Sequence, residues 1–371
     1  MEENESLYAI ALTLIKGLGP INCQHLYDAF GSATAIYEHR SDLLSHVPDA
    51  SPHLISLLQQ YDAALPRAEQ ELAFAQKKNV KVITFADQSY PQRLRTCADA
   101  PVVLYYCGNA DLNKVRVISM VGTRKITEYG KELCANFVSD LHRYYPDTLI
   151  VSGLAYGVDI HSHRAALLNG MDTVGVLAHG LDRIYPSVHR ATAVEMVSHG
   201  GLLTEYLSGT APERTNFLSR NRIVAGMCDA CVVVQSAARG GSLITARLAQ
   251  AYSRELCTFP GRVNDEFSVG CNRLISDGEA HLITSAEDFL KAVNWPDPLQ
   301  HQGPVQQELF LNLSDDEQLV LDTLKGHDEL PINAIVQSTG LTFSTISVIL
   351  FTLEMRGIVR SLGGARYKIC W

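Results

Sequence analysis

A glycine-rich turn near the middle of the chain has the residue types that bind anions. The apolar run Leu149-Ile150-Val151 is typical of a buried strand, and the segment Ser152 to Asp159 (Ser-Gly-Leu-Ala-Tyr-Gly-Val-Asp) follows it directly. Alanines and leucines at helical spacing occupy residues 161–169. A glycine turn between a strand and a helix directs backbone N–H groups at one point, where the helix dipole adds positive potential. We therefore predict that this turn, with Gly153 and Gly157, binds an anion, most simply a phosphate.

Similar residues follow the other strands predicted between residues 116 and 245. The candidate binding residues are Gly122, Thr123, Arg124, Ser152, Gly153, Gly157, Arg214, Phe217, Arg220, Asn221, Arg222, Gly240, Gly241 and Ser242. Because the carboxyl ends of parallel strands share one edge of a sheet, we expect these residues to lie together. One arginine guanidinium can donate two parallel hydrogen bonds to phosphate oxygens, and an exposed aromatic ring offers a stacking face to an unpaired base. The set predicts a groove for single-stranded nucleic acid rather than for one small nucleotide.

Each of these residues also has a simpler structural explanation. A glycine after a strand is commonly just a turn, a single arginine is commonly a solvated surface group, and Phe217 taken alone would commonly be a core residue. Their recurrence at the same end of successive strands favours binding over these explanations.

The elements that must position these residues alternate between strand and helix. Strands are predicted at 116–121, 148–152, 172–177, 202–205, 230–235 and 256–259, and helices at 127–144, 160–169, 189–199, 220–227, 242–253 and 285–292. Two earlier apolar runs, 80–85 and 102–106, are typical of further strands. This alternation predicts an α/β fold, with an extended Rossmann-like parallel sheet covered by helices on both faces.

The N-terminal segment, residues 1–79, is predicted to be a helical domain of the SAM or helix–hairpin–helix type. The turn from Gly17 to Gly19 joins two helical patterns and resembles a helix–hairpin–helix, which holds a DNA phosphate on its backbone amides. The alternative is a tight turn in a small helical bundle. The segment has 5 basic and 10 acidic residues, a net charge of −5, which favours the bundle.

The C-terminal part is predicted to be a winged-helix domain over residues 314–371. Residues 80–293 form the predicted Rossmann-like domain, and the proline- and glutamine-containing stretch 294–313 is the predicted linker. Ser314 and Glu317 have the spacing of a capping box. The would-be recognition helix, 343–353, has no Lys or Arg, which favours protein contact or packing over DNA reading.

Overall composition limits where nucleic acid can bind. The chain has 371 residues, 46% hydrophobic residues and a net charge of −9, so it does not coat duplex DNA through bulk charge, and binding must be local. No run of about 18 apolar residues is present, and the N-terminus is acidic, so we expect a cytoplasmic protein without a membrane partner. The nine cysteines have no framework spacing and are expected to be reduced, with Cys228 and Cys231 in the core.

Motifs for several kinds of chemistry are missing from the sequence. There is no GxxxxGK[ST] P-loop, no GxGxxG after a strand and no GxSxG elbow. His161 and His163 are two residues apart on a predicted helix and therefore point to opposite sides, so a shared metal is not expected. We expect His163 to hold the glycine turn instead, and we expect no cofactor, no metal and no catalytic residue.

The sequence resembles a known family, the bacterial DNA-processing protein A family, also called DprA or Smf. The matching blocks are Val121-Gly122-Thr123-Arg124, Ser152 to Asp159 with His163, Gly180-Leu181-Asp182 with Tyr185-Pro186, Glu205-Tyr206, Phe217, Arg220 to Gly226, Gly241 to Ala246, Pro260-Gly261, and Gly270-Cys271-Asn272 with Leu274-Ile275. These blocks span about 160 residues in the family's order. The flanking helical and winged-helix domains fit the larger members.

The resemblance implies a single-stranded DNA-binding recombination mediator that is not an enzyme. Family members act in natural transformation, where they protect incoming DNA and load the RecA recombinase onto strands coated by single-strand-binding protein. They act as homodimers, and by resemblance the dimer surface would lie within residues 245–280, with Leu248, Tyr252, Leu274 and Ile275 as candidates.

The resemblance also implies roles for individual residues. Arg124 matches a DNA-binding arginine, Arg214 stands where a phosphate-binding lysine is common, and Phe217 matches a base-stacking phenylalanine. Leu218 replaces a common proline, and His189 replaces a common asparagine; nothing in the sequence explains the histidine.

The alternative is a nucleotide-binding enzyme on a related fold that processes nucleoside monophosphates. Such enzymes use a Gly-Gly-x-Gly-Thr loop with a glutamate. Here Gly240-Gly241-Ser242 lacks the next glycine and threonine, and no glutamate follows nearby.

Overall fold

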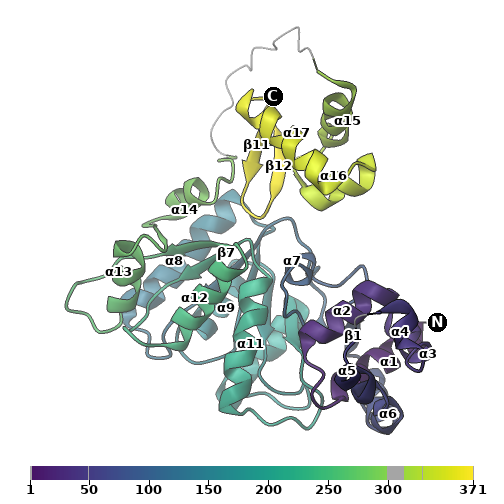
Figure 1. Cartoon of the computed structure of the whole chain (residues 1–371). Helices are drawn as coiled ribbons and strands as arrows, with labels where there is room; N and C mark the ends of the chain where they lie inside the picture. Colours follow the sequence, from purple (N-terminus) through teal and green to yellow (C-terminus); the bar gives the residue numbers. More distant parts are fainter. Residues whose placement is uncertain (1, 49, 299–312, 328, 371) are drawn as a thin grey trace. The chain divides into compact units, whose positions relative to one another are not determined.

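The computed structural model describes residues 2–48, 50–298, 313–327 and 329–370. Contacts divide the chain into two compact units, Met1–Leu282 and Ile283–Trp371. The first unit holds a helical segment and a nine-stranded sheet, and the second holds four helices with a three-stranded sheet (Figure 1). The helical segment and the large sheet are therefore one body, although the sequence predicts a domain boundary at residue 79. The predicted boundaries themselves stay predictions.

The large sheet is mostly parallel. Its strands are β1 (Lys81–Thr84), β2 (Val103–Gly108), β3 (Val117–Val121), β4 (Leu149–Ser152), β5 (Thr173–Val176), β6 (Gly200–Thr204), β7 (Ala230–Val233), β8 (Glu255–Thr258) and β9 (His281–Leu282). They lie in the order β1-β2-β6-β5-β4-β3-β7-β8-β9. The pairs from β6 to β9 are parallel, whereas β2 pairs antiparallel with both β1 and β6. The predicted α/β class is confirmed, with an antiparallel extension at one edge.

The central strands are short and apolar because both of their faces are covered. All five residues of β3 are buried, and Ile118 is paired with Ile150 of β4 and with Ala230 of β7. Helices on both faces leave no solvated side to a parallel sheet, so its strands become continuous apolar runs rather than alternating ones. This is why the strands could be found in the sequence as short apolar runs.

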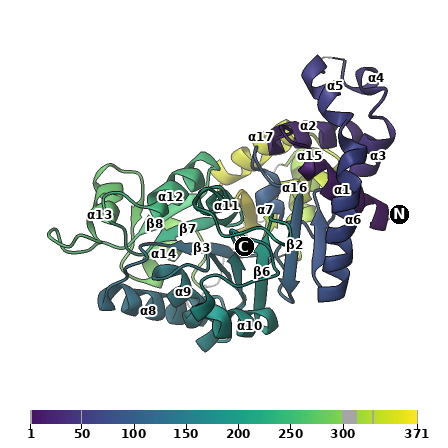
Figure 2. The same cartoon turned by 90° about the horizontal axis from the view of Figure 1, so that it is seen from below.

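Helices cover both faces of the sheet. Those that connect β3 to β6 are α8 (Glu128–Tyr144), α9 (Val158–Leu168) and α10 (Arg190–Ser198), and those that follow β6 are α11 (Arg214–Gly226), α12 (Gly241–Ala251) and α13 (Val269–Ser276). Figure 2 shows the first three on one side of the sheet and the last three on the other. Both α13 and β9 are absent from the sequence prediction, because each is short: α13 has 8 residues and β9 has 2.

The N-terminal segment is helical, as predicted, and shares a core with the sheet. It contains α1 (Glu2–Leu14), α2 (Pro20–Phe30), α3 (Ala33–Glu38), α4 (Leu43–His46), α5 (Pro52–Leu58) and α6 (Tyr61–Lys78), and the short α7 (Gln92–Arg95) follows β1. One apolar cluster extends from α1 through the β1 region to β7 and α12. Tyr27 packs edge-on against Phe85 at 5.6 Å, and Gln24 Nε2 donates to the carbonyl groups of Cys97 and Ala100. These contacts fix the helical segment against the sheet.

The second unit is a winged helix preceded by one further helix. Its elements are α14 (Ala286–Ala292), α15 (Asp315–Leu324), β10 (Leu330–Pro331), α16 (Ile332–Thr339), α17 (Phe343–Met355), β11 (Val359–Leu362) and β12 (Arg366–Ile369). The predicted capping box of Ser314 and Glu317 is present at the start of α15. Gly363 N donates to Val293 O over 3.0 Å, so α14 belongs to this unit by contact, although the sequence assigned it to the sheet domain. Most of the predicted linker 294–313 lies outside the described residues.

Helix α17 presents an apolar face to solvent. Val348, Phe351 and Met355 follow helical spacing and are 66%, 65% and 73% exposed. This agrees with the absence of Lys and Arg from residues 343–353. The preference for protein contact over DNA reading stays a prediction. Taken singly, no described helix is long and apolar enough to cross a membrane; α16 and α17 satisfy that criterion only as a pair, which is bent by 115°.

A buried ion pair joins α7 to the central strands. Arg93 Nε and Nη2 donate to the two oxygens of Asp229, at 2.6 and 2.8 Å, and Val117 N donates to Asp229 Oδ2 at 2.9 Å. Asp229 is 1% exposed and precedes β7, while Val117 begins β3. The carboxylate thus connects the amino ends of β3 and β7, the two strands whose carboxyl ends border the site described below.

Replacing this buried carboxylate should destabilise the first unit strongly. In Asp229→Ala, the guanidinium of Arg93 stays buried without its counter-ion, and we expect the free energy of unfolding to fall by about 3–5 kcal/mol. The matched control is Asp140→Ala, which removes the carboxylate of an exposed pair with Arg143 and should change stability by about 0.5 kcal/mol or less. Urea unfolding followed by circular dichroism measures both. Equal stability of the two variants would show that the buried Arg93–Asp229 pair contributes no more to the free energy of unfolding than the exposed pair does.

Candidate nucleic-acid interface

A cleft of about 830 Å³ opens where the carboxyl ends of β3 and β7 meet. The chain places β4, β5 and β6 on one side of β3 and then returns to place β7 on the other, so the loops after β3 and β7 diverge here. Open α/β sheets bind ligands at such switch points. The residues that line the cleft are Val121, Gly122, Thr123, Arg124, Gly153, Ala155, Asp159, Tyr185, Pro212, Arg214, Phe217, Leu218, Arg220, Asn221, Val224, Ser236, Ala237, Arg239, Gly240, Gly241, Ser242, Ile244 and Thr245.

The loop after β3 is held against the loop after β7. Thr123 N donates to Gln235 O over 2.7 Å. Gly122 packs so closely against Val158 that a Cβ would overlap with that side chain, which explains the glycine. Arg124 follows this fixed backbone and is exposed, so its guanidinium is free to reach into the cleft.

The turn after β4 contributes Gly153, Ala155 and Asp159 to the cleft lining, and its predicted role in binding a ligand anion stays a prediction. Two of its amides have partners within the protein: Ala155 N donates to Asp159 Oδ2 at 3.3 Å, and Val158 N donates to Thr123 O at 3.1 Å. Ser152 Oγ donates to Met120 O, and both Ser152 and Gly157 are buried and lie outside the cleft lining. The anion that this turn accommodates is the carboxylate of Asp159, which occupies the first turn of α9.

Arg220 lies beneath the cleft as a fixed charge. Its side chain is buried, at 4% exposed, beside Asp159, and Nη1 donates to Val176 O at the end of β5. A Cβ at Gly153 would overlap with both Arg220 and Asp159, so the glycine leaves room for the pair. Burial raises the pKa of Asp159 and lowers the pKa of Arg220, and the charge of each opposes the shift of the other. Arg220 therefore forms the floor of the site.

His163 supports the same floor from α9. Its Nε2 lies 2.5 Å from Gly153 O, and its Nδ1 lies 2.7 Å from Thr173 Oγ1. Burial lowers the pKa of His163 to about 4, so the ring is neutral near pH 7 and Nε2–H donates to the Gly153 carbonyl. The prediction that His163 holds the glycine turn is confirmed.

Helix α11 begins earlier than the sequence indicates. The sequence prediction starts a helix at residue 220, whereas α11 starts at Arg214 after the extended residue Glu213. The stretch 214–219 is rich in Thr, Asn and Ser, which favour turns, but Ile223 and Val224 are buried and anchor the helix by tertiary packing. The longer helix matters because Arg214, Phe217 and Asn221 now follow helical spacing and line the same side of the cleft.

An arginine and two aromatic rings meet in the cleft. The guanidinium carbon of Arg124 lies 5.3 Å from the centroid of the Phe217 ring, and the Tyr185 ring lies 6.0 Å from Phe217 at an angle of 59°. Tyr185 is 47% exposed and follows β5, so it offers a second stacking face. The sequence prediction did not include Tyr185 as a binding residue. The signal that could have found it is the Tyr-Pro pair after β5, at the same sheet edge.

The loop after β7 supplies unfilled amide groups. Gly240 is the N-cap of α12 and, as a glycine, has no side chain to satisfy the first-turn N–H groups. A Cβ at Gly240 or Gly241 would meet nothing closer than 3.5 Å, in contrast to the packed glycines at 122 and 153. These two positions therefore leave open space in which a ligand can approach the backbone. Ser242 Oγ is held by Ser236 Oγ at 2.9 Å.

The charge of the cleft differs from the charge of the whole chain. Four arginines line it, Arg124, Arg214, Arg220 and Arg239, and Asp159 is the single carboxylate among the lining residues. The net charge of the chain is −9, so positive charge is concentrated at this edge of the sheet. Such a local positive groove attracts phosphate without making the protein generally basic.

The comparisons with known proteins agree with this geometry. The model of the family described as DNA recombination-mediator protein A matches residues 81–294, and that of the DprA winged helix domain matches residues 307–365. The chain belongs to the DNA recombination-mediator protein A family. Membership assigns it a role in DNA processing as a recombination mediator.

Individual members of the family show how far the likeness extends. Protein Smf of Synechocystis is 30% identical over 99% of this chain and 100% of its own length. The crystal structure of DprA from Streptococcus pneumoniae has a TM-score of 0.59 and 30% identity, and covers 73% of this chain and 97% of its own. A structure of Helicobacter pylori DprA, described for its single-stranded DNA binding mode, has a TM-score of 0.52 and 30% identity. It covers 58% of this chain and 95% of its own.

Arg222, the second arginine of the block Arg220-Asn221-Arg222, does not face the cleft in this chain. Arg222 Nη2 donates to Glu205 Oε2 at 2.5 Å, and both side chains are largely buried. Arg222 is absent from the cleft lining, although the sequence prediction placed it there with Arg220 and Asn221. A helix turns by about 100° per residue, so neighbouring residues on α11 cannot all face one groove. Arg222 instead fixes α11 to the end of β6.

Metal sites and redox pairs are not found in the described part of the chain. Within the described residues, no group of three or more His, Cys, Asp and Glu side chains has the geometry to hold a metal ion. Cys228 and Cys231 are buried, and burial raises the pKa of both thiols, so they are protonated core residues as the sequence predicts.

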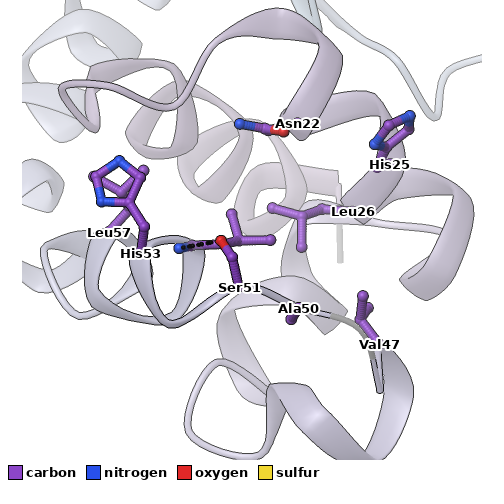
Figure 3. A pocket seen from close by; sticks show the side chains of 9 residues that line it. Asn22, His25, Leu26, Val47, Ala50, Ser51, His53 and Leu57 are labelled. Carbon is purple, nitrogen blue, oxygen red and sulfur yellow. Dashed lines mark hydrogen bonds between the residues drawn. The ribbon is translucent and has the colours of Figure 1, made fainter.

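The N-terminal helical segment of this chain contains a pocket of about 240 Å³, which is smaller than the cleft. It is formed by α2, α5 and the chain before α5, with Leu26, Leu57 and Val47 as apolar lining and with His25 and His53 beside it (Figure 3). None of its lining residues is Lys or Arg. The lining does not include Gly17 or Gly19, so the interpretation of the Gly17 turn as part of a helical bundle stays a prediction.

The buried state of His163 predicts a pH dependence of stability. Its folded pKa is about 4 against an ordinary value of 6.5, so between these values the unfolded chain takes up a proton that the folded chain does not. The free energy of unfolding should therefore fall as pH is lowered from 6.5 to 4, by up to about 3 kcal/mol for this group. His163→Gln should flatten the profile by that amount, and thermal unfolding of the wild type and of the variant across this pH range measures the difference. Parallel profiles for the two proteins would contradict the assignment.

Proposed function

We propose that the cleft binds single-stranded DNA and that the protein is a non-catalytic recombination mediator. The observation that carries the proposal is the meeting in one cleft of Arg124, from the loop after β3, with Arg214 and Phe217, from α11. Two arginine forks suit phosphate oxygens, and the rings of Phe217 and Tyr185 suit unstacked bases. The Helicobacter pylori relative, described for its single-stranded DNA binding mode, supports the same ligand.

The rings favour a single strand over a duplex. In duplex DNA the base faces are stacked on one another, and a protein reads base edges in the grooves instead. The rings of Phe217 and Tyr185 stack on base faces and do not read base edges. An unpaired strand presents its base faces directly. The chain's net charge of −9 also disfavours coating of a duplex by bulk attraction.

The chemistry of the cleft does not support the alternative of a nucleotide-processing enzyme. Asp159 is the single carboxylate among the lining residues, and it is occupied by Ala155 N and by the charge of Arg220. The enzymes of this alternative class use a carboxylate, and a carboxylate that acts as general base or nucleophile must be able to reach its substrate. Release of free base from nucleoside monophosphates at catalytic rates would overturn the non-catalytic part of the proposal.

The proposal includes the biological role that family membership implies. We infer that the protein acts in the cytoplasm, during natural transformation, by protecting incoming DNA and loading RecA onto strands coated by single-strand-binding protein. Membership in the recombination-mediator family supports this role.

We also propose a homodimer, but the candidate surface residues need correction. Leu274 is buried, and Leu248 and Tyr252 are half-buried and pack on the core, with Tyr252 Oη donating to Asp99. A buried side chain such as Leu274 is not available to a partner. The exposed large apolar side chains of residues 245–280 are Val263 and Val269.

Removing the cleft arginines should weaken binding for all sequences. For Arg124→Ala and for Arg214→Ala, we expect Kd for a labelled oligo(dT) to rise about tenfold, because each loses a charge-assisted contact to phosphate. The slope of log Kd against log salt should also fall by about 0.7 for each lost phosphate contact. Arg143→Ala removes an exposed arginine on α8 and serves as the control. Fluorescence anisotropy at several salt concentrations measures these values, and wild-type binding by the double variant would exclude the cleft.

Removing the rings should weaken binding without changing the salt dependence. Phe217→Ala and Tyr185→Ala should each raise Kd about 5- to 100-fold, because base stacking contributes about 1–3 kcal/mol per base. Phe217→Tyr keeps the ring and should keep most of the affinity. The same anisotropy titrations apply. A loss of affinity accompanied by a smaller salt slope would mean that the change disturbed phosphate contacts rather than stacking.

A further inference from the structure

A buried carboxylate of the helical segment holds one residue of the loop between β6 and α11. Glu71 of α6 is 1% exposed; its Oε1 accepts from Ser208 N at 2.8 Å, and its Oε2 accepts from Ser208 Oγ at 2.6 Å. Arg67, one turn earlier, pairs with Glu71 Oε2 at 2.9 Å and donates to Ser208 O at 2.8 Å. All three polar groups of Ser208 are therefore bound by two side chains of α6. We call this set the Glu71 clamp.

The clamped loop leads directly to the binding residues. Ser208 lies six residues before Arg214, and the loop is joined to α11 by the hydrogen bond from Tyr206 Oη to Asn216 O at 3.2 Å. The next residue, Gly209, donates its N–H to Asp182 Oδ1 at 2.9 Å. Asp182 belongs to the loop after β5, which carries Tyr185. The clamp thus reaches the loop that leads to α11, which carries Phe217, and, through Gly209, the loop that carries Tyr185.

We propose that Glu71 is a positioning residue for the DNA cleft, through which the helical segment sets the placement of α11 and of the Tyr185 loop. The inference rests on the proposed function of the cleft. A buried carboxylate is stable only when its oxygens are paired and hydrogen-bonded, so this contact has one well-defined geometry. A ligand that needs the cleft side chains in place binds more tightly when the loops are already ordered.

The geometry predicts that removal of the carboxylate loosens the clamp without touching the cleft. In Glu71→Gln, the side-chain amide keeps one acceptor oxygen but turns an N–H group toward Ser208, whose N–H and Oγ–H both need acceptors. The ion pair with Arg67 is lost as well. The loops then adopt more conformations, and DNA binding must order them.

The direct test compares two variants of the full chain. Glu71→Gln should raise Kd for labelled oligo(dT) about three- to tenfold, while the salt slope stays that of the wild type, because no phosphate contact is removed. Glu69→Gln makes the same charge change on the exposed side of α6 and should bind as the wild type does. Ser208→Ala, which removes a single hydroxyl, gives the same direction of effect and replaces Glu71→Gln if that variant does not fold.

A second measurement separates positioning from a merely structural role. Coupling between two sites is reciprocal, so DNA in the cleft should strengthen the clamp. In the wild type, oligo(dT) should slow hydrogen exchange of the Ser208 amide, and in Glu71→Gln this protection should be lost. A folded Glu71→Gln that binds like Glu69→Gln, with Ser208 exchange unaffected by DNA, would overturn the inference and leave the proposed function intact. Failure of the wild type to bind oligo(dT) would overturn the proposed function itself.

Discussion

The burial of Arg220 beside Asp159 is the arrangement on which the geometry of the cleft depends. Arg220 comes from α11, Asp159 from the first turn of α9, and the Val176 carbonyl that also accepts from Arg220 comes from β5. A guanidinium that is 4% exposed needs an anion and hydrogen-bond acceptors close by, so these three elements must keep their relative positions. Gly153 completes the arrangement because any side chain there would displace the pair.

This arrangement explains how an acidic protein can hold a phosphate-binding groove. The charges in the cleft are unequal in accessibility: Arg220 and Asp159 largely neutralise each other below the surface, while Arg124, Arg214 and Arg239 are exposed above them. The exposed arginines therefore determine what a ligand meets. Salt screens interactions between exposed charges that are more than a Debye length of about 8 Å apart, so the charges that line the cleft dominate at contact distance.

The helical segment and the sheet form one unit for reasons beyond a shared apolar core. Gln24 reaches the carbonyl groups near β2, and Glu71 with Arg67 binds the loop that leads to α11. These polar contacts are directional, whereas apolar packing tolerates small shifts. The N-terminal helices accordingly do more than cover the β1 edge of the sheet, since they contact the chain segment that carries the binding residues.

Much of the fold and part of the site could be read from the order of residues. Runs such as Leu149-Ile150-Val151 predict buried strands because both faces of a parallel sheet are covered, and the rule for open α/β sheets places Arg124 and Phe217 at one edge. The resemblance to the DprA family added the identity of individual binding residues. The antiparallel pairing of β2, the short α13 and the early start of α11 at Arg214 were not predictable, because each depends on packing against distant segments.

The sequence by itself determined the chemistry available at the sheet edge: arginines, glycine turns and aromatic rings after successive strands, in a chain whose net charge of −9 requires DNA binding to be local. Only the tertiary structure decided which of these groups meet solvent. It buried Ser152, Gly157 and Arg220, turned Arg222 toward Glu205, and brought Tyr185 into the cleft. The physical reason is that local sequence sets a residue's type and helical phase, whereas burial and pairing depend on elements that are far apart along the chain.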